Sequence, residues 1–183
     1  MMCRNHRTAS CLSVLCLLND FLYKQANSPR SYDIVLYGSG LETEKLEGKV
    51  DYKGFVSSDE LIATAEGEYG LAWYGSSLEG GSGALGEYLQ YNAPHKMSLY
   101  IRCGLPIIVW EKAGLAPFVK KNNVGICISS LTELEDILPK ISAGQYMEMK
   151  KNVLQIADKL SHGYYCFKAI KQACADLGVE IKG

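Results

Sequence analysis

Apolar and polar positions along the chain form short apolar runs separated by longer stretches with helical spacing. Apolar runs rich in β-branched or aromatic residues lie at 32–37, 50–56, 69–74, 107–110 and 124–128. Such runs are typical of strands that are covered on both faces, as in a parallel sheet. Helices are predicted at 57–65, 94–103, 115–123, 134–138, 145–160 and 164–177. Because every crossover between strands is long enough for parallel pairing, we expect an α/β fold with a doubly wound parallel sheet.

Residues with known capping preferences mark the predicted helix ends. Ser57 and Glu60 have the spacing of a capping box. Asn92 suits the N-cap of a later helix, Pro94 suits its first turn, and Gly104 suits the position after its last turn. The helix over 94–103 is therefore bounded on both sides.

The N-terminal stretch reads differently from the rest. An apolar run at 11–18 follows Arg4 and Arg7 and imitates a secretion signal. It continues into 19–24 without a small-residue cleavage site, and it is shorter than the roughly 20 residues that span a bilayer. We therefore predict an uncertain helical segment over residues 1–20 that packs on one domain over residues 21–183, in a cytoplasmic protein. An apolar run so early in the chain also suggests that further sequence precedes it.

Composition excludes several classes of function. The chain has 183 residues and a formal net charge of −1, which gives no reason to expect a nucleic-acid partner. Its seven cysteines include no Cys-x-x-Cys pair, and no histidine stands at zinc-ligand spacing. This pattern favours reduced thiols over disulfides or a metal site. No Asp-x-Asp occurs in the chain, so no metal ligands are predicted.

The candidate ligand-binding residues lie where the predicted strands end. Lys96 lies in the opening turn of a helix, where unpaired N–H groups and the positive end of the dipole favour an anion such as phosphate. Gly38 and Gly40 follow the first predicted strand, either as a tight turn or as a ligand-facing loop. The glycine-rich loop 75–86 follows another strand and is expected to be the most mobile part. In doubly wound sheets, ligands bind at this carboxyl edge.

Two segments of the sequence resemble a known family. Residues 92–100 read Asn-Ala-Pro-His-Lys-Met-Ser-Leu-Tyr, and residues 104–110 read Gly-Leu-Pro-Ile-Ile-Val-Trp. They resemble the nucleotide-sugar-binding half of GT-B glycosyltransferases, more narrowly the bacterial glucosyltransferase and β-1,6-galactofuranosyltransferase group. The resemblance, which covers about residues 21–175, implies a single Rossmann-like GT-B C-terminal domain. It also implies metal-independent transfer of a hexose from a UDP-sugar to an acceptor hydroxyl, in polysaccharide biosynthesis or protein glycosylation.

The resemblance also implies roles for individual residues. Asn92 and Lys96 would contact the UDP phosphates, while Ser98 and Tyr100 would support the ribose side or the pocket wall. His95 is either a direct contact or a packing residue, and both readings stay open. Residues of the same segment and of neighbouring turns complete the candidate binding set: Gly38, Gly40, Trp73, Glu87 and Pro94. No catalytic residue and no permanently bound cofactor is predicted, since the UDP-sugar is the donor substrate.

The chain departs from the family pattern in two respects. Leu99 stands where many GT-B enzymes have a glutamate that holds the ribose hydroxyls. Only one of the two GT-B halves is covered, so we expect a truncated or split donor-binding half that is inactive without its N-terminal acceptor-binding half. A non-catalytic binding or oligomerisation module is the alternative. A nicotinamide-dependent oxidoreductase is disfavoured, because the third glycine of its motif is missing. The sugar, the acceptor, self-association and peripheral membrane contact stay open.

Overall fold

Six parallel strands form the centre of the protein. The computed structural model describes residues 10–17 and 20–179. The strands lie in the order β3-β2-β1-β4-β5-β6, and every neighbouring pair is parallel. They are β1 (Cys11–Leu17), β2 (Asp33–Ser39), β3 (Asp51–Gly54), β4 (Tyr69–Ala72), β5 (Ile107–Trp110) and β6 (Gly125–Ile128). This order confirms the predicted doubly wound, Rossmann-like sheet.

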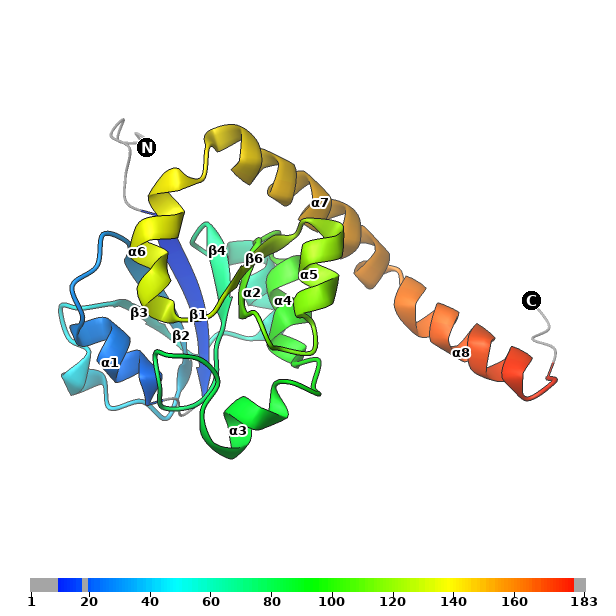
Figure 1. Cartoon of the computed structure of the whole chain (residues 1–183), viewed down its shortest axis with the longest axis horizontal. Helices are drawn as coiled ribbons and strands as arrows, with labels where there is room; N and C mark the ends of the chain where they lie inside the picture. The colour runs from blue at the N-terminus through cyan, green and yellow to red at the C-terminus, as the bar shows by residue number, and fades with distance from the viewer. Residues whose placement is uncertain (1–9, 18–19, 180–183) are drawn as a thin grey trace.

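Helices cover both faces of the sheet. They are α1 (Phe21–Asn27), α2 (Ser58–Thr64), α3 (Gly83–Tyr88), α4 (His95–Arg102), α5 (Ala116–Asn122), α6 (Leu134–Ile137), α7 (Ala143–Ser161) and α8 (Tyr164–Asp176), with 3₁₀ turns at Thr43–Lys45, Leu131–Glu133 and Leu138–Lys140. In Figure 1, α1 and α6 lie on one side of the sheet, and α2, α4 and α5 lie on the other. The order of strands explains this split. Right-handed crossovers change faces when the chain returns from β3 to β4.

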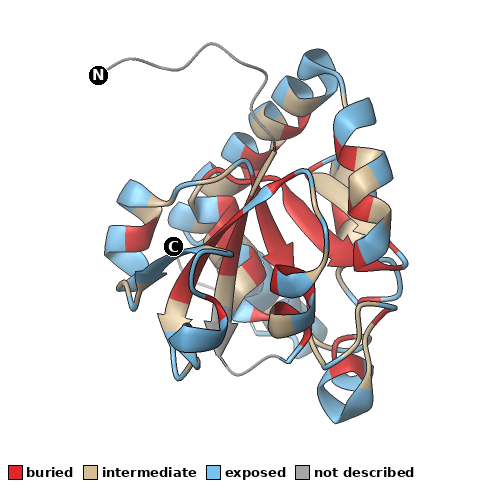
Figure 2. Cartoon of the chain, turned by 90° about the vertical axis from the view of Figure 1, so that its left-hand side faces the viewer, coloured by how far each residue is buried: buried red, intermediate tan, exposed pale blue. Residues whose placement is uncertain are grey.

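The core consists of the strands and the inner faces of these helices, as the buried residues in Figure 2 show. Side chains of β1 and β2 alternate between two clusters. Leu12 and Ile34 belong to the large core cluster with Phe21 of α1, whereas Val35 and Tyr37 pack with Leu61 of α2. All four residues of β5 are buried, as expected for an internal strand without alternation.

The helix predicted within residues 1–20 is wrong, because residues 11–17 form β1. This strand pairs with β2 on one side and with β4 on the other, so it belongs to the same sheet as the rest of the chain. A short run in which Ser13 is the one polar residue fits a buried strand as well as a buried helix, and periodicity cannot separate the two. Arg4 and Arg7 lie outside the described residues.

The start of α4 also differs from the prediction. Pro94 is the N-cap with extended backbone, and the helix begins at His95, so Asn92 is not the cap. The residue before a proline is held out of the helical region, which keeps Ala93 outside the helix. Asn92 instead donates its N–H to the Tyr88 carbonyl at 3.0 Å and closes the turn after α3. Gly104 follows the last turn with a positive φ of 72°, as predicted.

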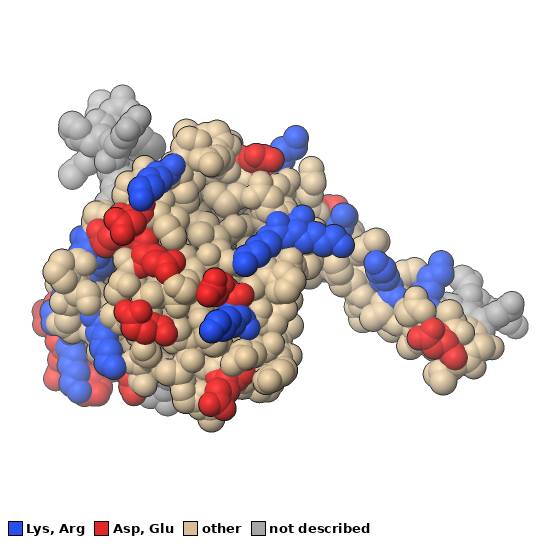
Figure 3. Space-filling model, in the orientation of Figure 1, with Lys and Arg blue, Asp and Glu red and all other residues tan. Residues whose placement is uncertain are grey.

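The C-terminal helix α8 extends away from the sheet, as Figure 1 shows. Gly163 has a φ of 68° and separates α8 from α7. No residue of α8 is buried, and Phe167, Ile170 and Leu177 are exposed. In Figure 3, basic side chains are visible along the ridge of α7 and on α8. Within residues 10–17 and 20–179, no helix is both long and apolar enough to cross a membrane.

Candidate functional site

A cavity of about 350 Å³ opens at the carboxyl edge of the sheet. It is lined by β1, β2, α2 and α4 and by the turns that follow β3 and β4; the residues are Leu15, Tyr37, Gly38, Phe55, Val56, Ser58, Leu61, Tyr74, His95, Lys96 and Leu99. The order of strands reverses between β1 and β4, and such a switch point is where open α/β sheets bind ligands. The structure therefore brings Gly38, His95 and Lys96 of the predicted set together in one cavity.

Lys96 is the second residue of α4, and its side chain is half-buried. Its Nζ donates a hydrogen bond to the Trp73 carbonyl at 3.2 Å and lies 3.7 Å from the centroid of the Tyr74 ring. The first turn of a helix carries backbone N–H groups without intrahelical partners and the positive end of the dipole. A full positive charge beside them makes this corner of the cavity suited to a phosphate group.

Trp73 and Tyr100 are buried in the core, so their side chains support the cavity without lining it. Both side chains have 0% relative exposure. The Trp73 indole donates to the Ser77 carbonyl at 2.9 Å. The Tyr100 hydroxyl donates to the Leu71 carbonyl at 3.0 Å and accepts the Leu15 N–H at 2.7 Å. An aromatic residue on the inner face of a helix, such as Tyr100, or at the end of a central strand, such as Trp73, is covered by the neighbouring elements.

Other predicted residues lie outside the cavity. Gly40 is exposed beyond the β2 turn, although its φ of 78° fits the predicted tight turn. Ser98 and Glu87 are exposed, and Asn92 is half-buried ahead of α4. Glu87 points outward because the preceding Gly86 packs directly on the chain at Gly81: a Cβ at Gly86 would lie 2.3 Å from that backbone. Roles for these residues in ligand binding stay predictions.

The glycine-rich loop is anchored at several points. The Ser82 hydroxyl accepts the N–H groups of Ser76 and Ser77 at 3.2 and 3.0 Å. Gly81 packs on the Trp110 ring, where a Cβ would come within 2.8 Å of the ring carbons. The loop also contains the start of α3, which the sequence did not reveal. Its predicted mobility stays a prediction.

Phe55 and Tyr74 are cavity residues that sequence reasoning missed. Phe55 follows Gly54, whose φ of 74° turns the chain at the end of β3, and the Phe55 side chain is 78% exposed. Tyr74 lies two residues past the end of β4. Each is an aromatic residue at the carboxyl end of a predicted strand, and that position at the carboxyl edge of the sheet was the available signal.

The electrostatics of the cavity favour an anionic ligand. Among the described residues that line it, the basic side chains are His95 and Lys96. Burial raises the pKa of Tyr74 to about 12, so its hydroxyl is neutral at physiological pH. Within the described part of the chain, no group of His, Cys, Asp or Glu side chains could hold a metal ion.

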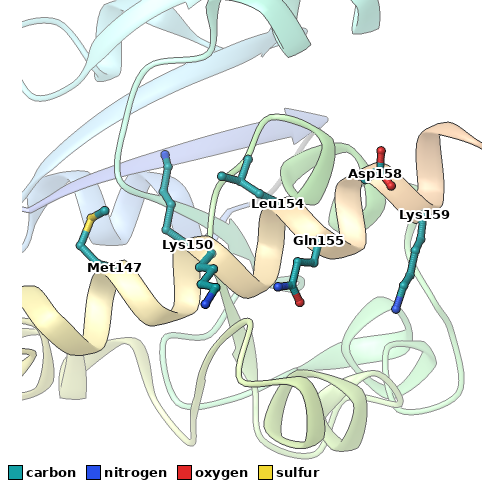
Figure 4. Close-up of a pocket in the computed structure, with 7 residues that line it drawn as sticks. Met147, Lys150, Leu154, Gln155, Asp158 and Lys159 are labelled. Atoms are coloured by element: carbon teal, nitrogen blue, oxygen red, sulfur yellow. The ribbon is translucent and has the colours of Figure 1, made fainter.

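A second hollow, of about 640 Å³, lies along the outer face of α7 (Figure 4). A single helix supplies its lining, which is Met147, Lys150, Lys151, Leu154, Gln155, Asp158 and Lys159. It therefore combines no strand ends and no helix N-terminus. The carboxyl-edge cavity is the stronger candidate site.

Comparisons with known proteins identify the family of the chain. The family profile described as "Glucosyltransferase 3-like, C-terminal domain" matches residues 18–173. The chain belongs to this family. It is therefore a glycosyltransferase C-terminal domain, as the motif in residues 92–110 had indicated.

Two curated relatives are similar to the chain over most of its length. Beta-1,6-galactofuranosyltransferase WbbI of Escherichia coli is 34% identical over 148 residues, which is 79% of this chain and 44% of that protein. Glucosyltransferase 3 of Streptococcus gordonii is 28% identical over 137 residues, which is 74% of this chain and 40% of that protein. The chain thus spans less than half the length of these relatives.

Solved structures support the fold. Anabaena HepE in complex with UDP-glucose superposes with a TM-score of 0.57 at 15% sequence identity, over 90% of this chain and 49% of that chain. WaaG, a glycosyltransferase involved in lipopolysaccharide biosynthesis, gives a TM-score of 0.53 at 16% identity, over 84% of this chain and 44% of that chain. The predicted GT-B, Rossmann-like fold is confirmed.

Proposed function

We propose that this domain binds the UDP part of a UDP-hexose donor for a glycosyltransferase. The observation that carries the proposal is the position of Lys96 in the first turn of α4, on the wall of a cavity at the switch point of the sheet. The proposal is also supported by the shared fold of HepE, which was solved in complex with UDP-glucose.

In this proposal, the two ends of the cavity take different parts of UDP. The diphosphate lies at the N-terminus of α4, beside Lys96, where backbone N–H groups and the ammonium meet. The nucleoside lies along the apolar wall formed by Phe55, Val56 and Leu99. Binding sites of this kind combine an apolar lining with a few placed polar groups.

The same corner would stabilise the transition state of sugar transfer. When the bond between the sugar and UDP breaks, negative charge grows on the diphosphate. A cation and a helix N-terminus held in advance at that place stabilise this charge without reorganising. Lys96 thereby supplies charge that a divalent metal supplies in other enzymes.

The whole reaction would need a second domain. We propose that the complete protein transfers glucose or galactofuranose to an acceptor hydroxyl in the cytoplasm, and that the acceptor half and the remaining catalytic groups lie outside this domain. The support is that the chain spans 44% of WbbI and 40% of Glucosyltransferase 3. The domain alone would then bind donor without turning it over.

Calorimetric titration with UDP tests donor binding. We expect Lys96→Met to weaken UDP binding about 10- to 100-fold, because a charge-assisted phosphate contact is lost. Lys120→Met, at an exposed lysine of α5, is the matched control and should leave the affinity unchanged. Equal UDP affinity for wild type and Lys96→Met, with both folded by circular dichroism, would refute the proposal.

Turnover measurements test the requirement for a second domain. The purified domain is mixed with UDP-glucose or UDP-galactofuranose and a panel of sugar acceptors, and released UDP is measured. We expect no release above the rate of spontaneous hydrolysis. Efficient sugar transfer by the domain alone would contradict the proposal that a second domain is required.

A further inference from the structure

Tyr74 and Trp73 together form a seat for the Lys96 ammonium. The two residues are adjacent and follow β4 directly. The Trp73 carbonyl accepts a hydrogen bond from Lys96 Nζ, and the Tyr74 ring lies beneath the same atom, with 3.7 Å between Nζ and the ring centroid. An ammonium over an aromatic face is attracted by the negative charge density of the ring.

Resting on the donor-binding function proposed above, we propose that Tyr74 is a positioning residue that holds the Lys96 ammonium at the phosphate end of the cavity. Tyr74 and Lys96 both line the cavity, so the ring and the charge face the space that a diphosphate would enter. A lysine side chain has a long flexible stem and loses much rotamer freedom when it is fixed. Holding it in place before the ligand arrives removes part of that loss from the binding step.

The seat is rigid because its backbone is anchored in the core. The Trp73 ring is fully buried and its indole is bonded to the Ser77 carbonyl at 2.9 Å. This bond and the burial of the ring hold Trp73 in place, and the next residue, Tyr74, contacts Lys96 in the first turn of α4. Tyr74 is itself half-buried. Because burial raises the pKa of Tyr74 to about 12, its hydroxyl stays neutral at the near-neutral pH at which UDP binding is measured.

Titrations with UDP, pyrophosphate and uridine test this role. We expect Tyr74→Leu to weaken UDP and pyrophosphate binding about 3- to 10-fold, the range that the loss of one cation–π contact predicts. Uridine affinity should change less than about 2-fold, because uridine carries no charge for Lys96 to meet. Tyr74→Phe keeps the ring and should retain wild-type affinity for all three ligands. A general structural defect would instead weaken uridine binding too and would not be rescued by phenylalanine.

A double-mutant cycle with Lys96→Met isolates the pair. When Lys96 is already methionine, Tyr74→Leu should have no further effect on pyrophosphate binding. Equal effects in both backgrounds would overturn the positioning role. If Lys96→Met weakens UDP binding but Tyr74→Leu does not, the inference about Tyr74 fails while donor binding at Lys96 stands. If Lys96→Met leaves UDP affinity unchanged, the proposal of donor binding at this site is refuted, and the role of Tyr74 that depends on it is refuted as well.

NMR of the free protein tests the seat without any ligand. An aromatic ring 3.7 Å from Nζ should shift the Lys96 ε-CH₂ protons upfield. The shift should persist in Tyr74→Phe and disappear in Tyr74→Leu, or in Tyr74→Met if the leucine variant does not fold. A random-coil shift for Lys96 in the wild-type protein would overturn the inference.

Discussion

Tyr100 connects the two strands at the switch point of the sheet, and removing its hydroxyl tests how this connection stabilises the fold. β1 pairs with β4 through Leu12 with Tyr69 and Ser13 with Gly70. Farther along, the Tyr100 hydroxyl bridges the strands: it accepts the Leu15 N–H at 2.7 Å and donates to the Leu71 carbonyl at 3.0 Å.

Tyr100→Phe removes this bridge and little else, because the ring stays in place and the lost hydroxyl leaves almost no volume. The Leu15 N–H and the Leu71 carbonyl lose their bonds to this hydroxyl, and each unsatisfied buried group costs about 1–3 kcal/mol. The bond from the Leu15 N–H is only part-buried, which keeps the cost of losing it near the lower end, so we expect the free energy of unfolding to fall by about 2–4 kcal/mol in total. For a protein of this size, such a loss lowers the melting temperature by about 4–16 °C.

Urea unfolding followed by tryptophan fluorescence measures this effect, with the slope of the transition checked for constancy. Tyr91→Phe is the matched control, because Tyr91 is 87% exposed and the same atom is removed. A loss below about 0.5 kcal/mol for Tyr100→Phe would refute the bridging role, since surface changes alone reach that size. UDP affinity of the folded variant should stay within 3-fold of wild type; a larger loss would mean that the hydroxyl contacts the ligand.

Two further predictions concern the cavity wall and the thiols. Phe55→Ala should weaken uridine and UDP binding about 5- to 50-fold in calorimetry, because the base loses its stacking surface, and should leave pyrophosphate binding unchanged. Tyr88→Ala, at another exposed aromatic residue, is the control. Equal losses of affinity for both variants would contradict the placement of the base on Phe55. Burial raises the pKa of Cys11 and Cys103 to about 11, so at pH 8 only about one thiol in a thousand is ionised. Iodoacetamide followed by peptide mass spectrometry should therefore modify the exposed Cys166 well before Cys11 and Cys103, and equal rates would argue against this burial.

Apart from α3 and the N-cap of α4, the sequence predicted the later strands and helices well, because residues with turn or capping preferences mark their ends. The buried run of β5 stands between Gly104, which ends α4, and a turn, so its limits were visible. Asn123 ends α5 in the left-handed conformation, at the last position of the helix predicted over 115–123. Where local residues determine both ends of an element, sequence reasoning is sufficient.

The error at β1 has the opposite cause. Nothing local decides whether a seven-residue apolar run becomes a strand or a buried helix. β1 is a strand because it completes the sheet between β2 and β4, partners that lie about 22 and 57 positions later in the chain. Pairing between such distant segments is a tertiary effect, which no window of the sequence contains.

The residues of the candidate site show the same contrast between local and tertiary signals. Lys96 could be predicted because a lysine in the first turn of a helix after a strand is a local pattern with a direct electrostatic meaning. For Tyr74 and Phe55 the sequence gives only their position at the ends of predicted strands, because their place in the cavity depends on which strand ends lie beside α4 once the sheet has formed. Trp73 belongs to the predicted binding set, but its side chain is buried and its backbone carbonyl is the group that contacts Lys96. A sequence can thus identify the charged group of a phosphate site, but the groups that hold that charge in place emerge only from the packing of the sheet.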